Sequence, residues 1–494
     1  MAENEVDLLA INLPYEFPFK LNNFSRPSRS PCVTRGGTIY EPLYLALSVA
    51  FAKREGYEAK IVDAVASNLS FYQVFEIAEK LNPRLIVIDT STPSIYNDTL
   101  MADALKKLIG CEVLLVGRHV TYAPKETLLR YCKYVNIVAR NYFWQQVLDL
   151  LEGKEIEKIN GISYKENGEV KHNLPANLPK REFPFVSEIY KEQLDLRKYF
   201  YASMKYPYLL MNYQFGCKFN CSFCNEYRKA GFFARPIDNV IEELKFIQRE
   251  MPWVKSVLWD DPTFVINEDK ICELCSEIID NKIKLHFGCA TRANISKETL
   301  KIMKEANFTE SFHIGLETLD QEGLDKFIHK GMSINQELEY LKNCKEVGIR
   351  NHGCFIIGLE TDTNEKLKAN LEFIKRLPAI DSIQVFPLIP TPFENIFGNE
   401  AENTAWNKVK KYLIPEVWDN EEIDYSKWLK PNGKYNCVVS YPWLTKEQIE
   451  AWIERYYKEF YFRPKYIAYK IKQSMNFAEL QRNFMAFKSF FLKS

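Results

Sequence analysis

The chain has 494 residues, more than a single hydrophobic core usually supports, so we expect two or three domains. Lysine plus arginine and aspartate plus glutamate number 65 each, and this balance provides no overall field for nucleic acid or another polyanion. The sequence contains no long uncharged apolar run, and its first residues carry acids where a secretory signal carries basic residues. We therefore expect a cytoplasmic protein, monomeric and without a nucleic-acid partner.

Residues 1–160 alternate short apolar runs with helical patterns, which predicts βαβ units and an α/β fold with a parallel sheet. The predicted strands are 6–11, 59–63, 85–89 and 112–117, and the predicted helices are 42–56, 71–81 and 97–109. Ligands of such sheets bind beyond the carboxyl ends of the strands. The loops that follow the four strands are therefore the candidate binding loops.

Residues 161–205 interrupt this alternation and are interpreted as a linker. The pair Asn167-Gly168 lies between two alternating segments (ISYKENGEVKH), which predicts a hairpin. A stretch with several prolines (NLPANLPKREFPF) follows it.

Residues 206–400 contain a second alternating series. The predicted strands are 207–214, 254–260, 284–290, 310–317, 350–357 and 382–388, and the predicted helices are 236–250, 268–280, 296–306, 334–347 and 363–376. Six strand–helix units are fewer than the eight that close a full barrel. The series predicts a partial (β/α)6 TIM-type barrel with a side opening for a bulky substrate.

Residues 401–494 are helical in pattern and rich in aromatic residues. Thr445 with Gln448 resembles a capping box that begins a helix. We interpret the region as a helical cap that packs on the barrel. The alternative is peripheral contact with the inner face of the membrane, because basic residues interleaved with phenylalanine suit a lipid interface.

Three of the twelve cysteines form a cluster, Cys217-x3-Cys221-x2-Cys224, directly after the first predicted barrel strand. An iron–sulfur cube held by three thiolates keeps one iron open for another ligand. Zinc usually has a second ligand pair, and Cys272 and Cys275 are interpreted instead as an ordinary helical pair, although zinc and coincidence remain alternatives at this point. We expect most of the other cysteines to be small buried side chains.

The cysteine spacing, with Phe223 before the last cysteine, resembles the signature of radical S-adenosylmethionine (SAM) enzymes. The resemblance implies that Cys217, Cys221 and Cys224 hold a [4Fe-4S] cluster whose fourth iron binds SAM. It also implies an electron donor such as ferredoxin or flavodoxin. Further motifs at successive strand ends resemble the family's SAM-binding positions. Besides Phe223, the residues that they assign to SAM are Asp260, Asp261, Arg292, Glu317, Gly358 and Gln384.

An α/β domain in front of such a barrel resembles the cobalamin-dependent branch of the family, which includes the anaerobic Mg-protoporphyrin ester cyclase, hopanoid-processing enzymes and many methyltransferases. The resemblance implies a Rossmann-like cobalamin-binding domain, with cobalamin contacts at Ser91, Thr92, Gly117 and His119. The D-x-H-x-x-G motif, whose histidine ligates cobalt in several cobalamin proteins, is absent. The cobalt of a bound corrin would therefore lack a lower ligand from a histidine of the first loop.

These resemblances predict an enzyme that methylates an unactivated carbon of a lipid, a tetrapyrrole or another hydrophobic small molecule. The alternative is a cyclase or ring-rearranging enzyme that uses the same cofactors without methyl transfer. A more distant alternative is a corrinoid or zinc carrier without enzymatic activity. The sequence identifies no catalytic side chain beyond the cluster ligands.

Overall fold

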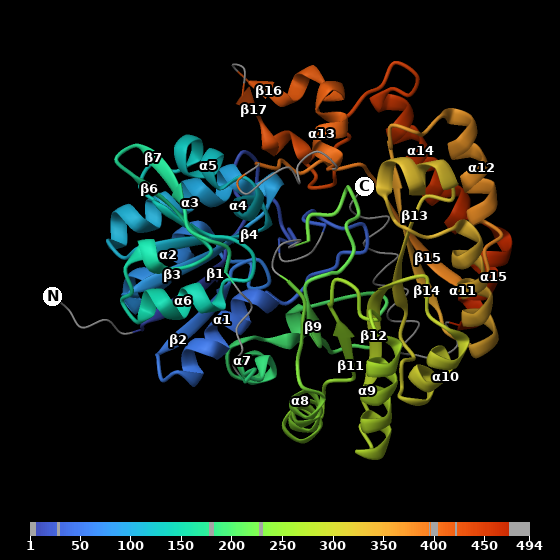
Figure 1. The fold of residues 1–494 in the computed structure, drawn as a ribbon, viewed down its shortest axis with the longest axis horizontal. Helices are drawn as coiled ribbons and strands as arrows, with labels where there is room; N and C mark the ends of the chain where they lie inside the picture. Colours follow the sequence, from blue (N-terminus) through green and yellow to red (C-terminus); the bar gives the residue numbers. More distant parts are fainter. Residues whose placement is uncertain are drawn as a thin grey trace.

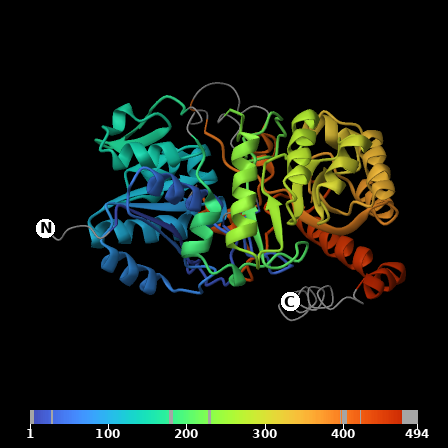
Figure 2. The same ribbon diagram turned by 90° about the horizontal axis from the view of Figure 1, so that it is seen from below.

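Two α/β units lie side by side in the computed structural model, and a C-terminal region borders the second unit (Figures 1 and 2). The structure describes residues 6–26, 30–176, 182–226, 231–394, 396, 404–419 and 422–473. The two sheets belong to different units, as the composition and length predict for a chain of this size.

The first unit contains a seven-stranded sheet in the order β2-β1-β3-β4-β5-β6-β7. Its strands are β1 (Leu8–Asn12), β2 (Ala59–Asp63), β3 (Leu85–Thr90), β4 (Glu112–Gly117), β5 (Ile137–Ala139), β6 (Ile162–Glu166) and β7 (Glu169–His172). Strands β1 to β5 are parallel, and β6 and β7 are antiparallel. The predicted hairpin is present as β6 and β7, but it extends this sheet and is not part of a separate linker.

Helices cover both faces of the first sheet. They are α1 (Leu43–Arg54), α2 (Phe71–Leu81), α3 (Ile95–Ile109), α4 (Arg118–Tyr122), α5 (Pro124–Glu126) and α6 (Trp144–Leu151). Helix α1 contacts β1, β2 and α6, whereas α3 contacts β3, β4 and α2. Helix α1 is buried along most of its length because α7 (Val186–Gln193) covers its outer side.

The second unit contains a six-stranded, fully parallel sheet in the order β15-β14-β13-β12-β11-β8. Its strands are β8 (Tyr208–Met211), β11 (Ser256–Trp259), β12 (His286–Arg292), β13 (Phe312–Glu317), β14 (Asn351–Ile357) and β15 (Ile380–Pro387). The connecting helices are α8 (Ile237–Glu250), α9 (Glu268–Asp280), α10 (Lys297–Glu305), α11 (Ile334–Val347) and α12 (Asn364–Ile374). All six strands predicted for residues 206–400 are confirmed.

Side-chain caps begin four of these helices directly after short loops. Asn267, Ser296, Ser333 and Thr363 each accept the main-chain N–H of the residue three positions later. Such a cap satisfies an N–H group that has no partner inside the helix. The caps therefore fix where the chain turns from the strand ends into the outer helices.

The inner face of the second sheet is incompletely packed. Strands β13 and β14 alternate fully buried residues with partly exposed ones, and the partly exposed row includes His313, Glu317, His352 and Cys354. Closed barrels fill this row with branched aliphatic side chains. Polar side chains at these positions indicate a lined cavity.

The C-terminal region packs against the open edge of the second sheet through residues 446–461, whereas residues 422–428 pack against α3 and the turn of Thr92 in the first unit. Its elements are α13 (Ala405–Val409), β16 (Trp418–Asp419), β17 (Glu422–Ile423), α14 (Lys446–Tyr461) and α15 (Pro464–Gln473). The predicted capping box of Thr445 and Gln448 begins α14, which runs along the edge strand β15. No helix in the described ranges is long and apolar enough to cross a membrane. The tail 475–494, on which the membrane interpretation partly depends, lies outside the described residues.

Candidate functional site

A cavity of about 330 Å³ lies between the two units, at the low end of the usual range for small-molecule sites. Residues of the first unit, of the cysteine loop and of the inner face of the second sheet line it together. The sequence-predicted residues among its lining are Thr92, Cys217, Cys221, Phe223, Cys224, Asp260, Arg292, Glu317 and Gln384. The structure therefore brings most of the predicted site residues to one cavity.

The cysteine loop is closed at its base by a short antiparallel pair, β9 (Gln214–Phe215) with β10 (Phe233–Ala234). Gly216 opens the loop with φ +78°, and a Cβ at this position would overlap the carbonyl oxygen of Gly231. Only glycine fits such a close approach of two backbone segments. The geometry therefore fixes the point at which the chain enters the loop, directly before Cys217.

Each of the three thiols has a polar neighbour. Cys217 Sγ lies 3.7 Å from Thr263 Oγ1. Arg292 Nη1 lies 3.6 Å from Cys221 Sγ, and the main-chain N–H of Glu226 donates to Cys224 Sγ at 3.4 Å. Burial raises the pKa of the Cys221 thiol, and the nearby Arg292 opposes this shift.

The donor set fits an iron–sulfur cluster. Within the described ranges, no three histidine, cysteine or acidic side chains converge on a position for a single metal ion. A [4Fe-4S] cluster does not require such convergence, since each cysteine ligates a different iron. Three thiols on one loop that face one cavity are the ligand set that such a cluster needs.

Charged groups of both signs lie beside the cysteines. Arg292 stacks on the ring of Phe219, with its central carbon 3.8 Å from the ring centroid, and donates to the carbonyl oxygen of Lys330. Lys330 Nζ forms a buried ion pair of 2.8 Å with Glu337. Glu317 has φ +64°, and burial raises its pKa to about 7 although Lys330 and Arg292 oppose the shift. This mixture of charges suits the zwitterionic methionine end of SAM.

Adjacent acids at the end of β11 have different environments. Asp261 is fully buried, and its carboxylate accepts the main-chain N–H groups of Tyr213 at 3.2 Å and Gln214 at 2.6 Å. Asp260 lines the cavity, whereas Asp261 does not. Asp261 is thus engaged in holding the turn that leads to the cysteine loop.

Gly358 also lies away from the cavity lining. Its carbonyl oxygen accepts the hydroxyl of Tyr441 at 2.8 Å, and its N–H donates to Asp362 at 2.8 Å. Ile449 of α14 packs above its Cα. The absence of a side chain at Gly358 therefore makes room for the C-terminal region, whereas Cys354, Phe355 and Ile356 of the preceding strand β14 line the cavity.

The four residues predicted for cobalamin have different positions. Thr92 lines the cavity, and Ser91 begins the short turn that carries it. Gly117 has φ +103° and leaves no room for a Cβ against Asp89 and Thr90. His119 is fully buried, with Nδ1 3.3 Å from Thr92 Oγ1 and its ring against that of Tyr425. His119 does not line the cavity, so it does not face a ligand held there.

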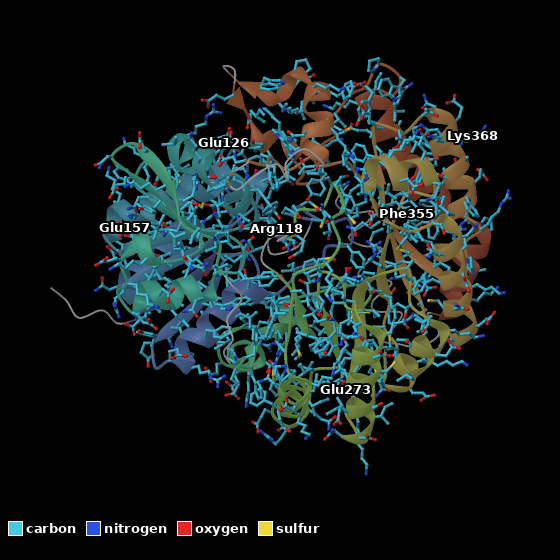
Figure 3. The ribbon with its side chains drawn as sticks, in the orientation of Figure 1. Arg118, Glu126, Glu157, Glu273, Phe355 and Lys368 are labelled. Carbon is cyan, nitrogen blue, oxygen red and sulfur yellow. The ribbon has the colours of Figure 1, made fainter. Side chains whose placement is uncertain are left out.

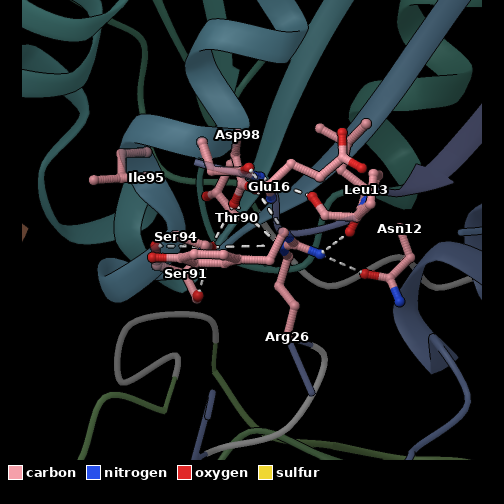
Figure 4. Close-up of polar contacts among 12 residues, drawn as sticks. Asn12, Leu13, Glu16, Arg26, Thr90, Ser91, Ser94, Ile95 and Asp98 are labelled. Atoms are coloured by element: carbon pink, nitrogen blue, oxygen red, sulfur yellow. Dashed lines mark hydrogen bonds and ion pairs between the residues drawn. The ribbon is translucent and has the colours of Figure 1, made fainter. Parts of the chain in front are cut away.

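The crevice between the carboxyl ends of β1 and β3, where strand order reverses, is filled by Arg26 (Figure 4). Its guanidinium pairs with both carboxylate oxygens of Asp98 at 2.8 and 3.1 Å, and donates to Asn12 at 2.8 Å and to the carbonyl oxygen of Leu13 at 2.6 Å. Ligands of open α/β sheets often occupy this crevice. Here a ligand of the first unit has to lie further out, beside Thr92 and Pro93.

The position of the cavity suits a corrinoid, since Thr92 and Pro93 at the strand ends line the same space as the three cysteines. A corrin ring is larger than the present cavity. No histidine of the first unit lines the cavity in the described ranges, in agreement with the absence of the histidine motif.

Several lining residues were not predicted from the sequence. His313 contacts the hydroxyls of Tyr201 at 3.2 Å and Ser203 at 3.1 Å, and His352 contacts Ser382 at 2.7 Å. Burial lowers the pKa of His352 to about 4, so its imidazole is neutral at pH 7. Only their place in an alternating strand could have indicated that these histidines face inward.

Residues 211–374 match the model of the Radical SAM superfamily. The chain is similar to an uncharacterized methyltransferase of Pyrococcus horikoshii, with 28% identity over 449 residues, 89% of this chain and 92% of the relative. It is also similar to the anaerobic magnesium-protoporphyrin IX monomethyl ester cyclase of Rubrivivax gelatinosus, with 25% identity over 403 residues, 78% of this chain and 72% of the relative.

Among solved structures, the fold is similar to that of the radical SAM methyltransferase TsrM from Kitasatospora setae with cobalamin and a [4Fe-4S] cluster bound. The TM-score is 0.67 with 12% identity, and the match covers 93% of this chain and 89% of that chain. The likeness therefore extends over both α/β units.

Proposed function

The chain is a radical SAM enzyme, with a [4Fe-4S] cluster and SAM as cofactors, and on that premise we propose that it methylates an unactivated carbon of a hydrophobic metabolite with the help of bound cobalamin. The observation that carries the proposal is the shared cavity. Strand-end residues of the first unit and the three cysteines line one space, so a methyl carrier and a radical source would meet the same substrate.

The proposal assigns a role to each part of the chain. Residues 1–160 would bind cobalamin, 206–400 would form the partial barrel, and 401–494 would cap it. Within 161–205, the hairpin belongs to the first sheet and the residues after it would link the units. When bound, the cluster and SAM supply a 5′-deoxyadenosyl radical that removes a hydrogen atom from the substrate, and cobalamin supplies the methyl group. The chain itself positions these groups and excludes water.

Within the site, Cys217, Cys221 and Cys224 would ligate the cluster. The carboxylates of Asp260 and Glu317 would bind the amino group of SAM, and the guanidinium of Arg292 would bind its carboxylate, because opposite charges pair strongly where water is excluded. Phe223 and Gln384, which line the cavity, would contact the rest of SAM. Of the residues predicted from the first unit, Thr92 and Ser91 remain candidates for cobalamin.

The inner end of the cavity suggests the substrate class. It is lined by the polar side chains of His313, His352 and Gln384, of which His352 is neutral at pH 7, together with aromatic rings such as those of Tyr40 and Tyr435. The charged side chains of the lining lie instead on the cysteine loop and at or beyond the carboxyl ends of the strands. We therefore expect a largely apolar substrate that carries an uncharged hydrogen-bonding group near the reacting carbon.

The second candidate function is ring formation without methyl transfer. The similarity to the protoporphyrin ester cyclase over most of this chain favours it. The two candidates differ in one product. Methyl transfer from SAM yields S-adenosylhomocysteine as well as 5′-deoxyadenosine, whereas cyclisation yields only 5′-deoxyadenosine.

The first experiment measures iron and corrinoid per chain after anaerobic purification from cells supplied with cobalamin. We expect about four irons, the content of one [4Fe-4S] cluster, and about one corrinoid per chain. The Cys221→Ala variant should lose the iron, and the control Cys272→Ala, on α9 and away from the cavity, should retain it. Iron without corrinoid would contradict methyl transfer, because the methyl carrier would be missing.

The second experiment identifies the substrate and the reaction. Extracts of a deletion strain and of its parent are compared by lipid and pigment mass profiles, and compounds that differ by one methylene mass are purified and added to the enzyme. Formation of both S-adenosylhomocysteine and 5′-deoxyadenosine would support methylation. Formation of 5′-deoxyadenosine alone would contradict it and favour the cyclase.

A further inference from the structure

The cysteine loop is held by the first α/β unit as well as by its own sheet. Glu226, two residues after Cys224, is 2% exposed and pairs with Arg118 at 3.2 Å between Oε2 and Nη2. Arg118 is the first residue of α4, at the carboxyl end of β4 of the first sheet. Figure 3 places Arg118 at the boundary between the two units.

Tyr142 of the first unit contacts the loop on both sides of the three cysteines. Its hydroxyl accepts the main-chain N–H of Gly216 at 2.6 Å, directly before Cys217, and lies 3.5 Å from Glu226 Oε1. Tyr122 of α4 donates to the carbonyl oxygen of Glu226. The residues directly before Cys217 and shortly after Cys224 are therefore held by neighbouring side chains of the first unit.

An aromatic cluster fixes the entry of the loop further. Phe215, the residue before Gly216, contacts the rings of Tyr142, Trp144 and Phe183 at centroid distances of 5.4, 5.2 and 4.9 Å. On the other side of the loop, Ser222 donates to the carbonyl oxygens of Phe327 at 2.5 Å and Ile328 at 2.9 Å. The loop thus bridges the two units.

One contact joins this arrangement to a cluster ligand. The same Glu226 whose side chain pairs with Arg118 donates its main-chain N–H to Cys224 Sγ at 3.4 Å. Hydrogen bonds to cysteine sulfurs are among the factors that set the reduction potential of an iron–sulfur cluster. Such a bond stabilises the more negative, reduced state and so raises the potential.

We propose that Arg118, Tyr142 and Glu226 are positioning residues through which the first unit sets the reduction potential of the cluster. The ion pair and the tyrosine hydroxyl hold Glu226 so that its N–H points at the sulfur of Cys224. When either is removed, Glu226 is released, the N–H···S bond lengthens, and the reduced cluster loses stabilisation. The inference rests on the cluster of the proposed function and not on methyl transfer.

The test is an EPR-monitored redox titration of the full chain with its cluster, without SAM. We expect Arg118→Met and Glu226→Gln each to shift the midpoint potential in the negative direction. The double variant should shift it no further than either single variant, because both substitutions break one interaction. Arg118→Lys, which retains the charge, should restore part of the shift.

The control is Arg84→Met. Arg84 forms an ion pair of 2.8 Å with Asp7 at the amino ends of β3 and β1, the end of the same sheet opposite to Arg118, and none of its hydrogen bonds or ion pairs reaches the described residues of the cysteine loop. We expect it to leave the potential unchanged. If Arg118→Met does not fold, Tyr142→Phe removes one hydroxyl only and should give a shift of the same sign.

An unchanged potential in Arg118→Met and Tyr142→Phe, or an equal shift in Arg84→Met, would overturn the inference. A native chain that holds iron but forms no methylated product would overturn the proposed methyl transfer and leave the inference standing. A native chain that binds no iron would overturn both.

Discussion

The hydroxyl of Tyr461 binds both main-chain groups of Ile383 on the edge strand β15: it accepts the N–H at 2.9 Å and donates to the carbonyl oxygen at 2.9 Å. Tyr457, one helical turn earlier on α14, does the same at Val385, with distances of 2.9 and 3.3 Å. Residues four apart on a helix lie on one face, and residues two apart on a strand share one side. The two tyrosines thus replace the missing neighbouring strand.

The first prediction concerns the stability of this edge. Tyr461→Phe leaves an N–H and a carbonyl group of Ile383 without their partner, and a buried unsatisfied group costs about 1–3 kcal/mol. We expect the free energy of unfolding to fall by about that amount in a denaturant titration. Tyr72→Phe, at an exposed position on α2, should have no comparable effect. Equal stability of the two variants would show that the hydroxyls do not support the edge.

The second prediction concerns the entry to the cysteine loop. Gly216→Ala adds a Cβ that overlaps the carbonyl oxygen of Gly231, in addition to the cost of φ +78°. Gly110→Ala has nearly the same φ, +82°, but its Cβ would meet nothing within 4 Å, so it should cost only about 1–2 kcal/mol. We expect Gly216→Ala to destabilise the chain more than this control and to lower its iron content. A matching effect of both substitutions on stability and iron would contradict the role of the close approach.

Strand and helix positions could be predicted from the sequence because each element carries its own periodicity. The six strands of the second unit and the cysteine loop after the first of them follow from local patterns alone. The pairing of Arg118 with Glu226 could not be predicted, since 108 positions separate the two residues and neither has a local signal.

Two residues predicted to bind SAM lie away from the cavity lining for a related reason. Asp261 and Gly358 occupy the strand ends at which the resemblance places SAM contacts, but neither lines the cavity. Asp261 serves the backbone of the turn before the cysteines, and Gly358 lies beneath the C-terminal region. A motif fixes the strand end at which a residue lies, whereas the tertiary packing decides which of two neighbouring side chains faces the ligand.

The third prediction separates the two neighbouring acids. Asp260→Asn should weaken SAM binding about tenfold, the effect of losing one charged contact of about 1.4 kcal/mol, with little change in the melting temperature. Asp261→Asn should instead lower the melting temperature. In the native chain the Asp261 carboxylate accepts two main-chain N–H groups, and an amide oxygen is a weaker acceptor for them. SAM binding is followed by calorimetry on the reconstituted chain, and melting by circular dichroism. The reverse pattern would assign Asp261 to SAM.

The fourth prediction concerns the pH dependence of stability. His119 is fully buried, with Thr92, Tyr131 and Tyr425 against its ring, and burial lowers its pKa to about 3. In the unfolded chain its pKa is about 6.5, so at intermediate pH the unfolded chain binds a proton that the folded chain rejects. The contribution of His119 to stability is therefore complete above pH ~6.5 and is lost progressively as the pH falls toward its folded pKa.

Between pH 6.5 and 4.5 this loss should amount to about 2 kcal/mol, since one pKa unit corresponds to about 1.4 kcal/mol. Denaturant titrations at several pH values measure it. His119→Gln removes the titrating group at this position. Its profile of unfolding free energy against pH should be flatter in this range, whatever its stability at pH 7. His329→Gln removes an exposed histidine whose pKa is lowered by partial burial and by Lys408, and it should flatten the profile less than His119→Gln. Parallel profiles of the native chain and His119→Gln would show that His119 is protonated in the folded protein, and thus that the pocket around it admits water.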